Sequence, residues 1–141
     1  MSPPSIPNQD ESHLKLLSIF HYVMVGYLGL EILILVAHFV IMNTIMLNPE
    51  IWKESGNSIP PQMAGILRAA YLFFGILLIA EIVLNVFCAR DLKVSKNRAL
   101  SFVASVTNCL HIPLGTILGI FTIIVLMRPT VIERYQRNLH Q

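Results

Sequence analysis

The sequence predicts an all-α membrane protein, a four-helix transmembrane bundle with two long spans and a short helical hairpin. The composition is the first reason, because 55% of the 141 residues are apolar and 13% are charged, against about 25% charged in soluble domains. The second is three apolar stretches (14–47, 62–89 and 99–127), each longer than the roughly 20 residues that span a bilayer. The third is Pro113-Leu114-Gly115, which interrupts the last stretch near its middle.

The first stretch follows a polar, proline-rich tail. Residues 1–12 carry Pro3, Pro4 and Pro7 without periodicity, which predicts a disordered N-terminal tail. No cleavable signal peptide is expected, because residues 1–11 hold no basic side chain. The transmembrane domain is predicted over 13–129, with its first helix from Leu14 until Asn48-Pro49 stops it.

A polar loop and a second helix come next. Residues 50–61 place Trp52 where an indole would lie at the headgroup level, and Pro60-Pro61 suits a helix start. The helix is predicted over about 62–89, followed by a short basic loop at 90–98. Residues 130–141 read as a polar, helical, cytoplasmic C-terminal tail.

The third stretch allows two topologies. Its 29 residues, Ala99 to Met127, carry no charge and would form a helix of roughly 44 Å, against a hydrocarbon core of about 30 Å. One alternative is three spans with a kinked third, which leaves five lysines and arginines on each side. The other is a hairpin that turns at Pro113–Gly115, with both termini on one side of the membrane.

The distribution of positive charge favours the hairpin. In that topology two basic residues, Lys53 and Arg68, lie on one side and eight lie on the other: Lys15, Arg90, Lys93, Lys96, Arg98, Arg128, Arg134 and Arg137. Because lysine and arginine are enriched in cytoplasmic loops, we expect both termini and the basic loop to be cytoplasmic.

Several polar residues fall inside the apolar stretches. Glu31 and His38 lie on one face of the first helix, Glu81 lies in the second, and Asn108 and His111 flank the turn. A carboxylate at membrane depth is costly unless it is protonated or paired, which makes such residues functional candidates. One interpretation is a proton relay or ion site built from Glu31, Glu81 and His111; the other is a set of packing contacts that fix helix register.

The sequence offers little support for catalysis or a cofactor. No nucleophile elbow, phosphate loop, dinucleotide fingerprint or zinc signature occurs, so we expect no enzyme, no metal, no cofactor and no nucleic-acid partner. Haem held by two histidines is the weaker alternative. Gly115 and Gly119 form a G-x-x-x-G that predicts close helix packing, with a low-profile partner surface at Ser101, Ala104 and Ser105.

Two motifs resemble those of a group of small bacterial integral membrane proteins of uncharacterised function. They are the opening Leu17-Ser18-Ile19-Phe20-His21-Tyr22 and the closing run from Pro113-Leu114-Gly115-Thr116 to Arg128-Pro129. The likeness covers about residues 14–131. The resemblance implies that the protein lies in a bacterial cytoplasmic membrane and that the chain turns at Pro113. It implies no activity and no functional residues.

The leading functional hypothesis is therefore a non-enzymatic accessory or assembly subunit, in contact with the lipid bilayer and with its own copies or another membrane protein. A proton- or ion-conducting element that uses Glu31, Glu81 and His111 is the first alternative, and a haem-binding membrane anchor is the second.

Overall fold

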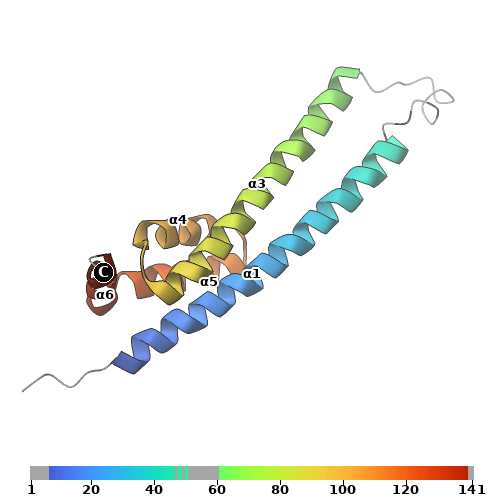
Figure 1. Cartoon of the computed structure of the whole chain (residues 1–141). Coiled ribbons are helices and arrows are strands. Elements are labelled where there is room, and N and C mark those ends of the chain that lie inside the picture. Colours follow the sequence, from blue (N-terminus) through green and yellow to red (C-terminus); the bar gives the residue numbers. More distant parts are fainter. Residues whose placement is uncertain (1–6, 47, 49, 51–60, 140–141) are drawn as a thin grey trace, which may run out of the picture. The chain divides into compact units, whose positions relative to one another are not determined.

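The computed structural model describes residues 7–46, 48, 50 and 61–139, and every element within them is helical. Two helices are long: α1 (Pro7–Ile41), which continues as the π-helical turn η1 (Met42–Met46), and α3 (Pro61–Val94). Three are short: α4 (Arg98–Asn108), α5 (Leu114–Leu126) and α6 (Pro129–Leu139) (Figure 1). The fold class predicted from the sequence is confirmed.

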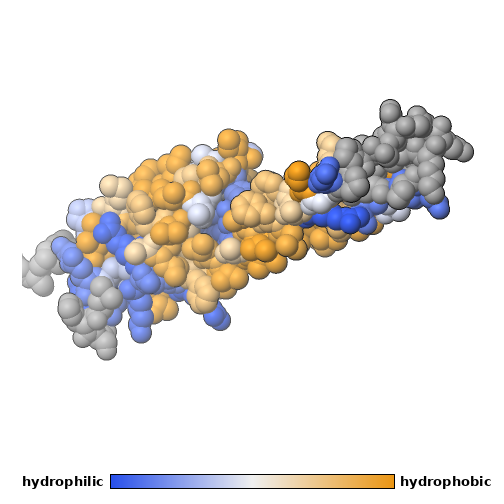
Figure 2. Space-filling model, turned by 90° about the horizontal axis from the view of Figure 1, so that it is seen from above, coloured by the Kyte–Doolittle hydropathy of each residue, from blue (hydrophilic) through white to orange (hydrophobic). Residues whose placement is uncertain are grey.

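The long helices are the membrane-spanning candidates. The segments 9–45 and 62–94 are long and apolar enough to cross a membrane. A third crossing exists only if α5 and α6 count as one broken span, and these two helices meet at a bend of 75°. Hydrophobic residues cover most of the described surface in Figure 2, as expected of helices whose solvent is lipid.

The third apolar stretch forms a hairpin rather than one kinked helix. α4 and α5 are separate helices that pack against each other along their length, with Arg98 of the first beside Leu126 of the second and Asn108 beside Gly115. They therefore run antiparallel. By helix rise they measure roughly 17 and 20 Å, less than the hydrocarbon core of about 30 Å.

Several predicted boundaries were wrong by a few residues. The hairpin turn lies at 109–113, so Leu114 and Gly115 already belong to α5. α1 begins at Pro7, which makes residues 7–12 helical rather than part of a disordered tail. α3 runs to Val94, so the basic loop shrinks to 95–97. The loop expected at 50–61, with Trp52, lies almost entirely outside the described residues.

The chain divides into two compact units. The hairpin unit comprises residues 1–26 and 81–141, and thus the first part of α1, the last part of α3, and α4 to α6. The two-helix unit comprises residues 27–80, from the rest of α1 and α3.

The core of the hairpin unit follows a helical repeat. Its buried residues recur at three- and four-residue spacings, as expected for one face of each helix: Leu14, Leu17, Ser18, His21 and Met24 on α1, Asn85, Cys88, Ala89 and Leu92 on α3, and Ser101, Ala104, Ser105 and Asn108 on α4. Many of these side chains are small or polar, so the helices approach closely.

Two glycines allow the tightest approach. A Cβ added at Gly119 would lie 2.3 Å from the Ser105 carbonyl oxygen, and one at Gly115 would lie 2.3 Å from the Asn108 carbonyl oxygen. Both distances are far below van der Waals contact, so α4 and α5 could not keep this separation with any larger residue. The G-x-x-x-G motif lies within the hairpin of a single chain.

Polar contacts and buried side chains hold the last helix, α6, in place within the hairpin unit. Arg128, just before α6, donates to Asp10 of α1 with Nη1 3.1 Å from Oδ1, and Thr130 donates to the other carboxylate oxygen. On the next turns Val131 and Tyr135 are buried. These contacts hold the start of α6 beside the start of α1.

Candidate functional site

Four buried polar side chains, one from each of four helices, meet inside the hairpin unit. His21 of α1, Asn85 of α3, Asn108 of α4 and Thr122 of α5 have at most 1% of their surface exposed. We call these residues the buried quartet. Since a buried polar group is costly unless it is hydrogen-bonded, the contacts within this quartet determine whether it stabilises the unit.

The two asparagines form a reciprocal pair. Asn85 donates through Nδ2 to Asn108 Oδ1 at 2.9 Å, and Asn108 donates through Nδ2 to Asn85 Oδ1 at 2.8 Å. The second amide proton of Asn85 goes to the Glu81 carbonyl oxygen at 3.0 Å. This pairing fixes the register of α3 against α4 and satisfies most of both amides.

His21 occupies the centre of the quartet. Its Nδ1 lies 2.8 Å from Asn85 Oδ1 and its Nε2 lies 3.3 Å from Thr122 Oγ1. Because an amide oxygen can only accept, Nδ1 carries the proton and a neutral ring leaves Nε2 as an acceptor. The Cys88 thiol, with Sγ 3.5 Å from Nε2, is placed to donate to it.

The quartet has no access to a substrate. His21 and Cys88 are a base and a nucleophile within contact distance, yet each is fully buried. His21 has both ring nitrogens engaged, so it could bind haem iron only by breaking one of these contacts. The described residues also contain no group of three or more histidine, cysteine or acidic side chains that could hold a metal ion.

Glu81 and His111 lie beside the quartet. His111 Nε2 is 3.2 Å from Glu81 Oε2, and each side chain is 18% exposed. Of the three residues predicted to form a proton or ion site, the structure brings these two together. The Glu81 backbone, through Asn85, joins this pair to the quartet.

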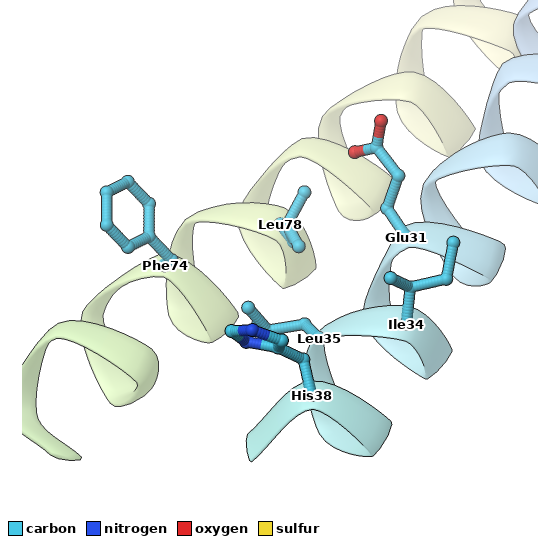
Figure 3. A pocket seen from close by; sticks show the side chains of 6 residues that line it. All are labelled: Glu31, Ile34, Leu35, His38, Phe74 and Leu78. Atoms are coloured by element: carbon cyan, nitrogen blue, oxygen red, sulfur yellow. The ribbon is translucent and has the colours of Figure 1, made fainter. Parts of the chain in front are cut away.

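Glu31 and His38, the other predicted site residues, belong to the two-helix unit. Both line an open groove between α1 and α3, together with Ile34, Leu35, Phe74 and Leu78. Figure 3 shows the Glu31 carboxylate and the His38 ring at separate ends of this groove. We call it the acid–histidine groove.

The polar groups of the groove have partners within the two-helix unit. Tyr71 of α3 lies with its hydroxyl 2.6 Å from His38 Nδ1, and Tyr27 bonds to Glu31 one turn along α1. Near the end of the unit, Arg68 donates twice to Asn43 Oδ1, at 3.2 and 3.0 Å. Unlike the buried quartet, His38 and Arg68 remain exposed.

A third polar centre connects α3, α4 and α6. Asp91 accepts backbone N–H groups from Lys96 and Asn97 at 3.1 and 2.6 Å through Oδ1. Its Oδ2 accepts the hydroxyls of Ser101 at 2.7 Å and Tyr135 at 3.1 Å. One carboxylate thus organises the tight connection before α4 and the docking of α6.

The environment of Tyr135 affects its ionisation. Burial raises the pKa of its phenol well above the usual range, and the neighbouring Asp91 carboxylate acts in the same direction. The neutral phenol is therefore the form that donates to Asp91.

The sequence predicts an intramembrane cluster that includes Asn108, Glu81 and His111 but not His21, Thr122 or Cys88. The sequence does contain a signal for His21. Three- and four-residue spacings place Ser18 and His21 on the same helix face as Leu14, Leu17 and Met24, so two polar residues lie on an otherwise apolar face.

Comparison with known proteins adds nothing to this geometry, because no family model, curated protein or solved structure matches the chain. The resemblance to small bacterial membrane proteins therefore stays a prediction from two motifs.

Proposed function

We propose that the protein is a non-enzymatic accessory or assembly subunit of the membrane, in which the two-helix unit binds a transmembrane helix of a partner. The partner is either another membrane protein or a second copy of this chain. The observation that carries the proposal is the acid–histidine groove, an open and mainly apolar groove that Glu31 and His38 line, between two helices long and apolar enough to cross a membrane.

The cost of exposing polar groups to lipid supports this assignment. Ionisable side chains in membrane helices face bundle interiors, cavities or other protein rather than hydrocarbon. Glu31 and His38 line a groove that is open on one side, and a packed partner helix would shield them. Interhelical hydrogen bonds from such residues contribute about 1 kcal/mol to association.

The orientation follows from charge. We propose that both termini and the 95–97 connection face the cytoplasm of a bacterial cell, because eight of ten lysines and arginines then lie on that side. The Asp10–Arg128 ion pair supports a shared side, since it joins the start of α1 to the start of α6.

The mass of the purified complex tests the proposal. In mild detergent, light scattering should give either the mass of one chain plus one defined partner or the mass of two chains. Ile34→Trp, which fills the groove, should reduce this mass to that of a monomer. Ile120→Trp is the matched control, because Ile120 is similarly exposed on α5 of the hairpin unit, and it should leave the mass unchanged.

A wild-type protein that is strictly monomeric would overturn the proposal. So would an equal loss of mass in the two tryptophan variants, because the association would then not involve the groove.

The Glu81–His111 pair favours proton or ion conduction as a second candidate. The buried quartet beside this pair counts against conduction, because the amides of Asn85 and Asn108 do not gain or lose protons near neutral pH. Proton or ion flux through reconstituted vesicles discriminates between the candidates. Conduction requires that the flux with wild-type protein be higher than that of empty liposomes, and that Glu81→Gln reduce it.

A further inference from the structure

A groove in the hairpin unit, separate from the quartet, is lined by three cationic side chains. It lies among the start of α1, the end of α3 and α6, and its volume of about 430 Å³ falls within the range of roughly 300–1,000 Å³ for small-molecule sites. Its lining comprises Glu11, Leu14, Lys15, Ile19, Leu92, Lys93 and Arg134. We call it the cationic groove.

The charges of the cationic groove do not balance. Lys15, Lys93 and Arg134 come from three different helices, and Glu11 is the one acid among the lining residues. Glu11 pairs with Lys15, with 2.8 Å between Oε1 and Nζ. Lys93 lies over the Tyr22 ring, with Nζ 5.4 Å from the ring centroid. An anion between the three cations would offset their mutual repulsion.

The groove also has an apolar side. Leu14 and Leu92 are buried, while Ile19 is 56% exposed. Leu14 is the first apolar residue after the polar turn at 10–13, and Leu92 lies near the end of α3. Figure 2 shows hydrophilic residues at the end that holds α6, next to hydrophobic residues. We therefore expect headgroups and acyl chains to meet at this groove.

We infer that the cationic groove binds one anionic phospholipid from the leaflet on the side of α6. The phosphate lies among Lys15, Lys93 and Arg134, and an acyl chain runs along Ile19. A soluble phosphate would satisfy the charges but would leave the apolar side uncovered, and a zwitterionic lipid would add its own cation to a site that already holds three. This inference does not depend on the proposed function.

Lipid retention measured by native mass spectrometry tests the inference. The full chain in mild detergent receives phosphatidylglycerol or phosphatidylcholine with the same acyl chains. One phosphatidylglycerol per chain should be retained in preference to phosphatidylcholine. Lys93→Gln and Arg134→Gln should each weaken its retention about fivefold, the factor that corresponds to one charge near an anionic headgroup.

Two variants on the same helices serve as controls. Arg90 of α3 and Arg137 of α6 are exposed and do not line the groove, so Arg90→Gln and Arg137→Gln should retain phosphatidylglycerol as wild type does. Glu11→Gln should strengthen retention, because it removes the negative charge. That gain could not come from a misfolded variant.

Three results would overturn the inference. Equal retention of the two lipids would exclude charge recognition, and an equal loss in Arg137→Gln would show diffuse attraction by the basic surface. Displacement of phosphatidylglycerol by millimolar inorganic phosphate would assign the groove to a soluble anion.

Discussion

The hairpin unit and the two-helix unit use polar side chains in opposite ways. In the hairpin unit His21, Asn85, Asn108 and Thr122 are buried and in contact with one another, and Thr122 donates its hydroxyl to the Leu118 carbonyl. In the two-helix unit Glu31 and His38 line an open groove. The difference shows that a polar residue in an apolar helix can be enclosed among helices of its own unit or lie at an open surface, and only the structure distinguishes the two.

The largest effect should come from the glycines that separate α4 and α5. Gly119→Ala places a methyl group against the Ser105 carbonyl, and we expect it to lower the free energy of unfolding by about 3 kcal/mol, the upper end of overpacking costs. Gly26→Ala is the control, because nothing lies within 4 Å of its added Cβ; it should be neutral or slightly stabilising. Denaturant titration followed by circular dichroism measures both, and similar values would contradict the packing described for the hairpin.

The second effect concerns the buried quartet. Asn85→Leu leaves the Asn108 amide and His21 Nδ1 without their acceptor, and an unsatisfied buried group costs about 1–3 kcal/mol. The double variant Asn85→Leu/Asn108→Leu should lose less than the sum of the single variants, because it removes both halves of the reciprocal pair. His38→Leu in the two-helix unit should change stability little. A full additive loss in the double variant would show that the amides do not act as a pair.

The hairpin topology and the quartet were not equally predictable. Pro113, the uncharged run and the positions of lysine and arginine were enough to predict that 99–127 folds back, because all three can be read from the sequence without knowing which helices pack together. The partners of His21 were not predictable, because Asn85 and Thr122 are 64 and 101 residues away and only the packing of four helices brings them together. The early start of α1 was missed because Pro7 suits a first helical turn as well as a disordered tail.

A smaller effect should follow from loosening α6. Tyr135→Phe removes one of the hydroxyls bound to Asp91, which should cost about 1 kcal/mol. The raised pKa of this phenol has a defined sign: its contribution to stability is complete below the unfolded pKa near 10 and is lost as pH rises toward the higher folded value. Wild type should therefore lose stability above about pH 10, and Tyr135→Phe should lose less over the same range. Identical pH profiles would exclude this role.

The smallest effect is expected at the ion pair between α1 and the start of α6. Asp10→Asn weakens the contacts with Arg128 and Thr130, but these side chains are partly exposed, so the loss should stay below about 1 kcal/mol. Limited proteolysis of residues 129–139 should detect it as faster cleavage. Protection equal to wild type would mean that Tyr135 and Val131 alone hold α6.

Site-specific photocrosslinking in native membranes tests the contrast between the units most directly. A photoreactive residue at Ile34 or Phe74 in the acid–histidine groove should give one discrete protein adduct, and the same residue at Ile120 or Phe121 on the exposed face of α5 should give none. Glu31→Leu should abolish the groove adduct without unfolding the chain. Adducts of equal yield from both units, or lipid adducts alone from the groove, would contradict the account.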